Sequence, residues 1–174
     1  MKRWSLFIVG LMAAAVASAQ HKHNVPESKQ EDWATAYVAG YTRDKWLVIL
    51  DAERNFYAAK REAERISKLS RVPFSMEGMQ FDQRRGLALQ DTGDGAPDAG
   101  GYIARRYNED AANSSGYISI EKSDGYPGLR EGLYVVVGAI CNSSREANAK
   151  LRHFQQFARS AYVAKTQIYM GCIH

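Results

Sequence analysis

Three carboxylates with a spacing suited to cation binding lie in a stretch of turn residues. Asp91, Asp94 and Asp98 fall within residues 91–101, which are rich in glycine and contain one proline. Calcium takes several oxygen ligands from loops of this kind. No glutamate that could bind through both oxygens follows at the expected place. We therefore expect a loop without metal, with a calcium site as the alternative.

The rest of the sequence offers no catalytic group together with its partners. Asp91-Thr92-Gly93 matches the active-site triplet of aspartic proteases, but that chemistry needs a second carboxylate on a matching lobe. We find no nucleophile elbow, no zinc-protease helix motif and no phosphate-binding loop. His21 and His23 are two possible metal ligands on a polar tail, too few for a good site. We expect a protein that binds its ligand without catalysis, metal or cofactor.

The N-terminus has the pattern of a secretory signal peptide. Lys2 and Arg3 precede an apolar stretch at residues 6–16, and Ala17-Ser18-Ala19 resembles a cleavage site. Residues 1–19 are expected to be removed, and no other apolar run approaches the length of a membrane span. The formal charge then falls from +4 to +2, because Lys2 and Arg3 are lost. We expect a periplasmic protein without a membrane span, and the lack of a basic stripe argues against nucleic acid.

The chain has only two cysteines, Cys141 and Cys172. In an oxidising compartment an even pair of cysteines predicts a disulfide. Each lies at the C-terminal end of an expected strand, so both would reach the same edge of the sheet, with one strand between them. Two free thiols, or a reactive site, are the alternative.

The C-terminal part of the chain predicts a β-α-β unit. Residues 134–137 are β-branched and aromatic, which is typical of a covered strand. Ser143 and Glu146 have the spacing of a capping box at a helix start. The apolar positions of this helix recur on one face: Ala147, Leu151, Phe154 and Ala158. A second strand is expected at about residues 162–170.

A similar pattern occurs earlier in the chain. Leu47 lies 88 positions before Val135 (135 minus 47), and at this offset Asn55, a good N-cap, falls on Ser143. The pattern predicts a strand at about residues 45–50, a helix at about 55–69 and a strand at about 74–81. We interpret it as an internal duplication in which two halves share one sheet, because one half cannot bury its sheet face alone.

Two segments fall outside this repeat. Residues 20–43 are expected to form a tail with a short helix, and residues 83–116 an irregular central insertion. Residues 117–121 alternate like a half-buried strand and lead through a turn into the strand that begins at Leu133. This strand competes with residues 74–81 for the place beside residues 134–137, and both topologies remain open.

These residues resemble a SPOR (sporulation-related repeat) domain. A strand that ends in Val137-Gly138-Ala139, a capped helix that opens with Glu146-Ala147 and a returning strand resemble one half of that domain. The approach at residues 123–129 is similar to the loop before this strand in SPOR-like extracytoplasmic proteins. The resemblance covers residues 117–170 well and residues 45–81 weakly.

The resemblance implies an α+β fold. Residues 44–174 would form duplicated β-α-β halves in a ferredoxin-like, SPOR-like antiparallel sheet with two helices on one face. It also implies that the open sheet face binds peptidoglycan glycan strands, without catalysis. Aromatic side chains on that face would stack on sugar rings, and the candidates are Tyr117, Tyr126, Tyr134, Tyr162 and Tyr169.

A protein ligand is the second hypothesis. A small secreted domain with a long insertion also suits a periplasmic immunity protein that neutralises an antibacterial toxin, for example a type VI secretion effector. Arginine and aromatic residues are favoured anchors at protein interfaces. The partner-binding candidates in the insertion are Tyr102, Arg105, Arg106 and Tyr107.

Overall fold

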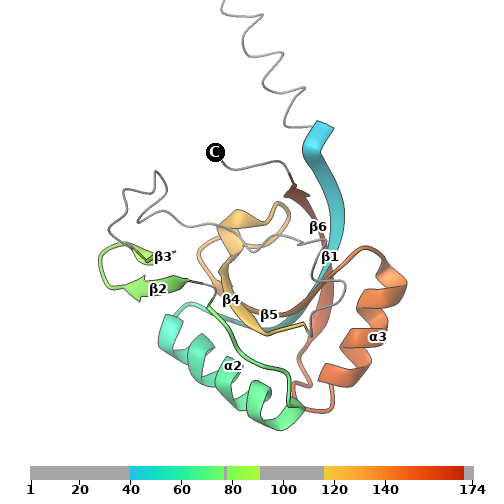
Figure 1. Cartoon of the computed structure of the whole chain (residues 1–174), viewed down its shortest axis with the longest axis horizontal. Helices are drawn as coiled ribbons and strands as arrows, with labels where there is room; N and C mark the ends of the chain where they lie inside the picture. Colours follow the sequence, from blue (N-terminus) through green and yellow to red (C-terminus); the bar gives the residue numbers. More distant parts are fainter. Residues whose placement is uncertain (1–39, 77, 91–115, 171–174) are drawn as a thin grey trace, which may run out of the picture.

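The computed structural model describes residues 40–76, 78–90 and 116–170 (Figure 1). It is a mixed α/β structure with a four-stranded antiparallel sheet in the order β4-β5-β1-β6, two helices and a separate two-stranded sheet, β2-β3. The elements are β1 (Thr42–Glu53), α2 (Phe56–Ser70), β2 (Met79–Asp82), β3 (Gly86–Leu89), β4 (Ser119–Lys122), β5 (Tyr134–Cys141), α3 (Ser144–Phe154) and β6 (Tyr162–Tyr169).

Helix α2 forms where the sequence predicts it. The Asn55 side chain accepts a hydrogen bond from the Ala58 backbone N–H at 3.1 Å, which satisfies one of the free donors at the helix start. The helix ends at Ser70, and the following residue, Arg71, has a left-handed backbone with φ of 61°. The positions at helical spacing that it buries against the sheet are Phe56, Ala59, Ala63 and Ile66.

Helix α3 has the predicted cap with one difference. Ser143 Oγ accepts from the Glu146 N–H at 3.2 Å, as expected. The Glu146 carboxylate accepts in turn from the Asn142 N–H, one residue before the cap, at 3.2 Å. Ala147 and Phe154 are buried, and the helix ends at Phe154, so Ala158 is buried by the following turn rather than by the helix.

Gly138 in the middle of β5 has a packing role. A Cβ added there would lie 2.9 Å from Leu50 Cδ2 and 2.9 Å from Phe154 Cε2, closer than carbon atoms can approach. The missing side chain therefore lets β1 and α3 pack directly against the backbone of β5. This close packing explains why a glycine follows Val137 in the sequence pattern.

The prediction that residues 74–81 form a strand of the main sheet is wrong. Phe74 makes an isolated parallel bridge to Ile118, and the following strand β2 pairs with β3 instead. Gly78, with φ of +78°, interrupts the segment between them. The neighbour of β5 is β4, which follows the competing topology that the sequence left open. The β2-β3 pair also places a strand, β3, inside the segment expected to be irregular.

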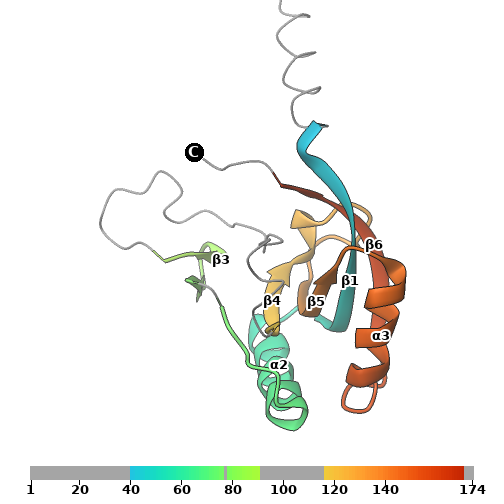
Figure 2. The ribbon, with the colours of Figure 1, turned by 45° about the vertical axis from the view of Figure 1, so that its right-hand side comes forward.

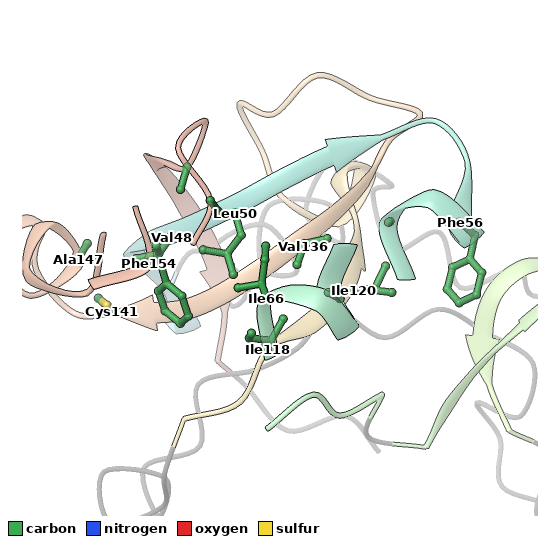
Figure 3. Packing of buried hydrophobic residues seen from close by; sticks show 14 of the residues in the cluster. Val48, Leu50, Phe56, Ile66, Ile118, Ile120, Val136, Cys141, Ala147 and Phe154 are labelled. Carbon is green, nitrogen blue, oxygen red and sulfur yellow. The ribbon is translucent and has the colours of Figure 1, made fainter. Parts of the chain in front are cut away.

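Apolar side chains cover both faces of the central strands. On one face, residues of both helices pack with Val48, Leu50, Ile120 and Val136 (Figure 3). The other face, which we call the second face, carries Leu47, Ile49, Val135 and Val137, each at most 1% exposed. Tyr126 and Leu129, from the β4-β5 connection, pack against this second face.

Several expectations lie outside the described residues. They include the signal peptide at residues 1–19, most of the tail and helix at residues 20–43, the calcium alternative at residues 91–101, and Cys172. Within the described part of the chain, no helix has both the length and the apolar character needed to cross a membrane.

Candidate ligand-binding site

A strap made of residues 123–132 crosses the second face of the sheet. Ser123 Oγ accepts from the Leu133 N–H at 3.0 Å, and Asp124 Oδ1 accepts from the Gly132 N–H at 2.6 Å, so the base of the strap is closed. At its far side, Thr166 Oγ1 donates to the Pro127 carbonyl oxygen at 2.9 Å. The strap therefore reaches from β4 and β5 to the opposite edge strand, β6.

The strap fills the centre of the face that the sequence suggested for glycan. Its Tyr126 is 1% exposed and belongs to the apolar cluster of Leu47, Ile49 and Val135. Such a ring is a core residue, and it cannot stack on a ligand without the strap moving.

The five candidate tyrosines do not form one platform. Tyr117 is half-buried before β4, and Tyr126 of the strap is buried against the second face. Tyr162 pairs with Ile49 on the second face and is 45% exposed. Tyr134 packs on the helix side, against Phe56 of α2. Only the backbone of Tyr169 is described, in β6.

Tyr134 belongs to a different group of rings, which we call the aromatic cluster: Phe56, Tyr57, Phe81 and Tyr134. Phe56 and Phe81 are stacked, with ring centroids 4.3 Å apart. Tyr57 meets Phe81 edge-to-face at 5.3 Å, and Tyr134 meets Phe56 edge-to-face at 5.6 Å. These are favourable geometries for aromatic pairs. Tyr57 is 50% exposed, so the cluster presents one ring to solvent.

Three elements that are distant in sequence position the cluster. Phe56 and Tyr57 open α2 directly after the Asn55 cap, and Tyr134 opens β5. Phe81 comes from β2, so the β2-β3 hairpin, which projects from the body beside the start of α2, completes the cluster (Figure 1).

The hairpin turn places arginines beyond the cluster. Asp82 Oδ1 accepts from the Arg84 and Arg85 backbone N–H groups at 2.8 and 2.9 Å, which closes the turn. Gly86 follows with φ of +75°, and its Cβ position lies 3.2 Å from Tyr134 Oη. Arg84 and Arg85 are exposed, and they directly precede Gly86, the residue that lies beside the Tyr134 hydroxyl.

The rim of the cluster carries both hydrogen-bond donors and acceptors. Burial raises the pKa of the Tyr134 phenol, with a further contribution from the Asp124 charge, so this hydroxyl stays protonated and can donate. The backbone N–H groups of Arg85 and Arg84 lower the pKa of Asp82, which stays ionised. An exposed ring with such a rim can stack on an apolar ring face and bond surrounding hydroxyls.

The histidine and the cysteine of the described segments are His153 in α3 and Cys141 at the end of β5, outside the cluster. The described residues also contain no group of three or more histidine, cysteine or acidic side chains that could hold a metal ion.

Sequence reasoning missed Tyr57 and Phe81. A signal for Tyr57 was present, because it follows Phe56 at the helix start but falls outside the apolar stripe of Ala59, Ala63 and Ile66. An aromatic residue on the solvent side of a helix is a reasonable binding candidate. Phe81 gave no such signal, because its segment was assigned to the main sheet.

The remaining candidate residues are placed only in part. Cys141 is buried at the end of β5, and β1 lies between β5 and β6 as expected. Cys172 lies outside the described residues, so the disulfide stays a prediction. The same holds for the partner-binding candidates Tyr102, Arg105, Arg106 and Tyr107.

The geometry of these residues carries the functional argument. No protein-family model, curated protein or solved structure matches the chain.

Proposed function

We propose that the chain is a non-catalytic, SPOR-like binding protein of the periplasm. The strand order supports this fold, because β1-α2-β4 and β5-α3-β6 are two β-α-β halves that interleave in one antiparallel sheet. In the sheet, β5 lies between β4 and β1, the strands of the first half, and β1 lies between β5 and β6, the strands of the second half. The duplication thus involves β4 rather than residues 74–81. The periplasmic location rests on the signal peptide pattern of residues 1–19.

We propose that its ligand is the glycan strand of peptidoglycan and that the aromatic cluster holds it. The observation that carries this proposal is the half-exposed Tyr57 ring, which meets Phe81 edge-to-face. Phe81 in turn contacts the Tyr134 ring. A sugar presents an apolar ring face surrounded by hydroxyls, and this arrangement complements both. The strap argues for the cluster over the second face, because it occupies the centre of that face.

The rim of the aromatic cluster suits a ligand with several hydroxyl groups. The Arg84 and Arg85 side chains supply donors, and the nearby Asp124 carboxylate supplies an acceptor. Sugar hydroxyls can both donate to the acid and accept from the arginines.

A pull-down on purified peptidoglycan tests the proposal. The mature protein is incubated with sacculi, untreated or treated with an amidase that strips the stem peptides. Saturable binding that increases on stripped glycan would support a glycan ligand, since the sugars are then more accessible. Absence of binding to both preparations would contradict the proposal.

The protein ligand remains the second candidate. It is favoured by the combination of the exposed Tyr57 ring with Arg84 and Arg85 on a projecting hairpin, since arginine and aromatic anchors dominate protein interfaces. An immunity function would require tight binding of a toxin encoded beside this chain. Replacement of both arginines by glutamate should then abolish the complex in a titration with that toxin. If the unmodified protein does not bind the toxin, the immunity function is contradicted.

A further inference from the structure

The outer surface of the helical layer is strongly basic. Residues 56–71 and 144–159, which contain α2 and α3, hold nine lysines and arginines against three glutamates, a net charge of +6. The other described residues hold eight lysines and arginines against seven acidic side chains, a net charge of +1. Among the described residues, the positive charge is therefore concentrated on the helical layer.

The three glutamates of this layer are already engaged. Glu62 receives two hydrogen bonds from the Arg65 guanidinium, at 2.5 and 2.8 Å, and this contact lowers the pKa of Glu62. Glu64 pairs with Lys60 at 3.8 Å, and Glu146 accepts from a backbone N–H. Seven exposed cations have no acidic partner among the described residues: Arg61, Lys68, Arg71, Arg145, Lys150, Arg152 and Arg159.

The helical spacing directs these cations away from the sheet. Arg61 and Lys68 are seven positions apart, as are Arg145 and Arg152, so each pair lies on one face of its helix. That face is opposite the buried positions Ala63 of α2 and Ala147 of α3. Both helices lie on the same side of the sheet (Figure 2), so their outer faces form one side of the molecule.

An exposed apolar side chain lies in this basic surface. Leu69 of α2 is 52% exposed, next to Lys68 and two positions before Arg71. Cations around an exposed leucine match the boundary of an anionic membrane, where the charges meet lipid headgroups and the leucine enters the acyl region. A polar anionic polymer would use the charges alone.

We infer that the helical layer, through Arg61, Lys68, Arg145 and Arg152 with Leu69, binds an anionic phospholipid surface. Tyr57 of the aromatic cluster lies four positions before Arg61 on α2, so the two sites adjoin on one helix face. The inference does not depend on the proposed glycan ligand. Such contact would hold the protein against the membrane with its sheet and strap facing away from the lipid.

Vesicle co-sedimentation of the mature protein tests this inference. Vesicles of phosphatidylcholine alone are compared with vesicles made of equal parts of phosphatidylcholine and phosphatidylglycerol. Each comparison is made at low and at high salt. We expect binding only to the anionic vesicles, and loss of binding as salt screens the charges. Equal binding to both vesicle types, or no binding to either, would overturn the inference.

Two charge-matched variants locate the surface. Arg61→Ala with Lys68→Ala removes two cations from the helical layer and should weaken binding by roughly tenfold. Arg43→Ala with Arg130→Ala removes the same charge from exposed positions on β1 and the strap, across the sheet from the helices, and should leave binding unchanged. Equal losses in both variants would show that only net charge matters, which contradicts the assigned surface.

Leu69→Ser distinguishes a membrane from an anionic polymer. We expect it to weaken vesicle binding but not retention on heparin, a soluble polyanion without an apolar phase. If vesicle binding is unchanged in Leu69→Ser, the surface reads charge alone and the membrane assignment is wrong. Thermal unfolding of each variant checks that the fold is intact.

Discussion

The Thr166 hydroxyl donates a hydrogen bond to the Pro127 carbonyl oxygen at 2.9 Å and thereby fastens the strap to the edge strand β6. These residues are 39 positions apart in sequence. Their contact holds Tyr126 on the second face of the sheet, where it is buried. The strap is thus part of the core and occupies the centre of the second face.

The strap makes Tyr126 a stability residue. Tyr126→Ala should lower the free energy of unfolding by about 3 kcal/mol or more, because it leaves a cavity over Leu47 and Val135. Thr166→Val should cost about 1 kcal/mol, through loss of the bond to Pro127. Urea denaturation measures both. Tyr162→Ala, at an exposed position, is the control and should change stability by less than about 0.5 kcal/mol. A Tyr126→Ala variant as stable as this control would refute the role of the strap.

Gly138 should not tolerate a side chain. Gly138→Ala places a methyl group 2.9 Å from Leu50 and Phe154 and should destabilise the fold by about 1 to 3 kcal/mol. Gly116→Ala is the matched control, because nothing lies within 4 Å of its Cβ position. Thermal melts of the two variants give the comparison. Equal melting temperatures would show that the contact around Gly138 can relax.

The caps define where the helices begin. Asn55→Ala and Ser143→Ala should each cost about 1 kcal/mol, since each removes the side-chain acceptor of a backbone N–H in the first turn. Asn55→Asp keeps the acceptor and should be close to neutral. Denaturant midpoints test this series. A similar loss in Asn55→Asp and Asn55→Ala would argue against the cap.

Two neighbouring acids should have opposite effects on stability as pH changes. Burial raises the pKa of Asp51, aided by the Glu62 charge, so its contribution is fully present below the unfolded value of 3.8 and is lost as pH rises through the folded pKa. The Arg65 hydrogen bond lowers the pKa of Glu62, so its contribution is present above the unfolded value of 4.5 and is lost as pH falls through the folded pKa.

These signs give a direct test. At pH 7, Asp51→Asn should stabilise the protein and Glu62→Gln should destabilise it. Both effects should shrink when the urea midpoint is measured at about pH 3, where the carboxyls become protonated. The two predictions are contradicted if Asp51→Asn and Glu62→Gln shift the urea midpoint in the same direction at pH 7.

Local signals predicted most of the secondary structure. The caps at Asn55 and Ser143 and the apolar stripes after them act within one helical turn, so the sequence alone identifies α2 and α3. Residues 134–137 identify β5 in the same local way, because a run of β-branched and aromatic residues is typical of a buried strand.

Contacts between distant residues could not be predicted in this way. Phe74 and Phe81 look like sheet residues, and only the pairing of β2 with β3 shows that they leave the main sheet. The Tyr126 ring looks like a ligand contact until the bond between Thr166 and Pro127 places it in the core. The aromatic cluster depends on the same long-range arrangement, since Phe81 reaches Tyr57 only through the hairpin.

The central claim is that the aromatic cluster holds a glycan strand, and titration of soluble, peptide-free glycan fragments into two variants tests it most directly. Tyr57→Ala removes a half-exposed ring from the cluster, and Tyr162→Ala removes a similarly exposed ring from the second face. We predict that Tyr57→Ala weakens binding by about tenfold or more, as expected for an exposed stacking ring, and that Tyr162→Ala binds like the unmodified protein. The opposite result, with binding lost in Tyr162→Ala and kept in Tyr57→Ala, would place the glycan on the sheet face and contradict the account.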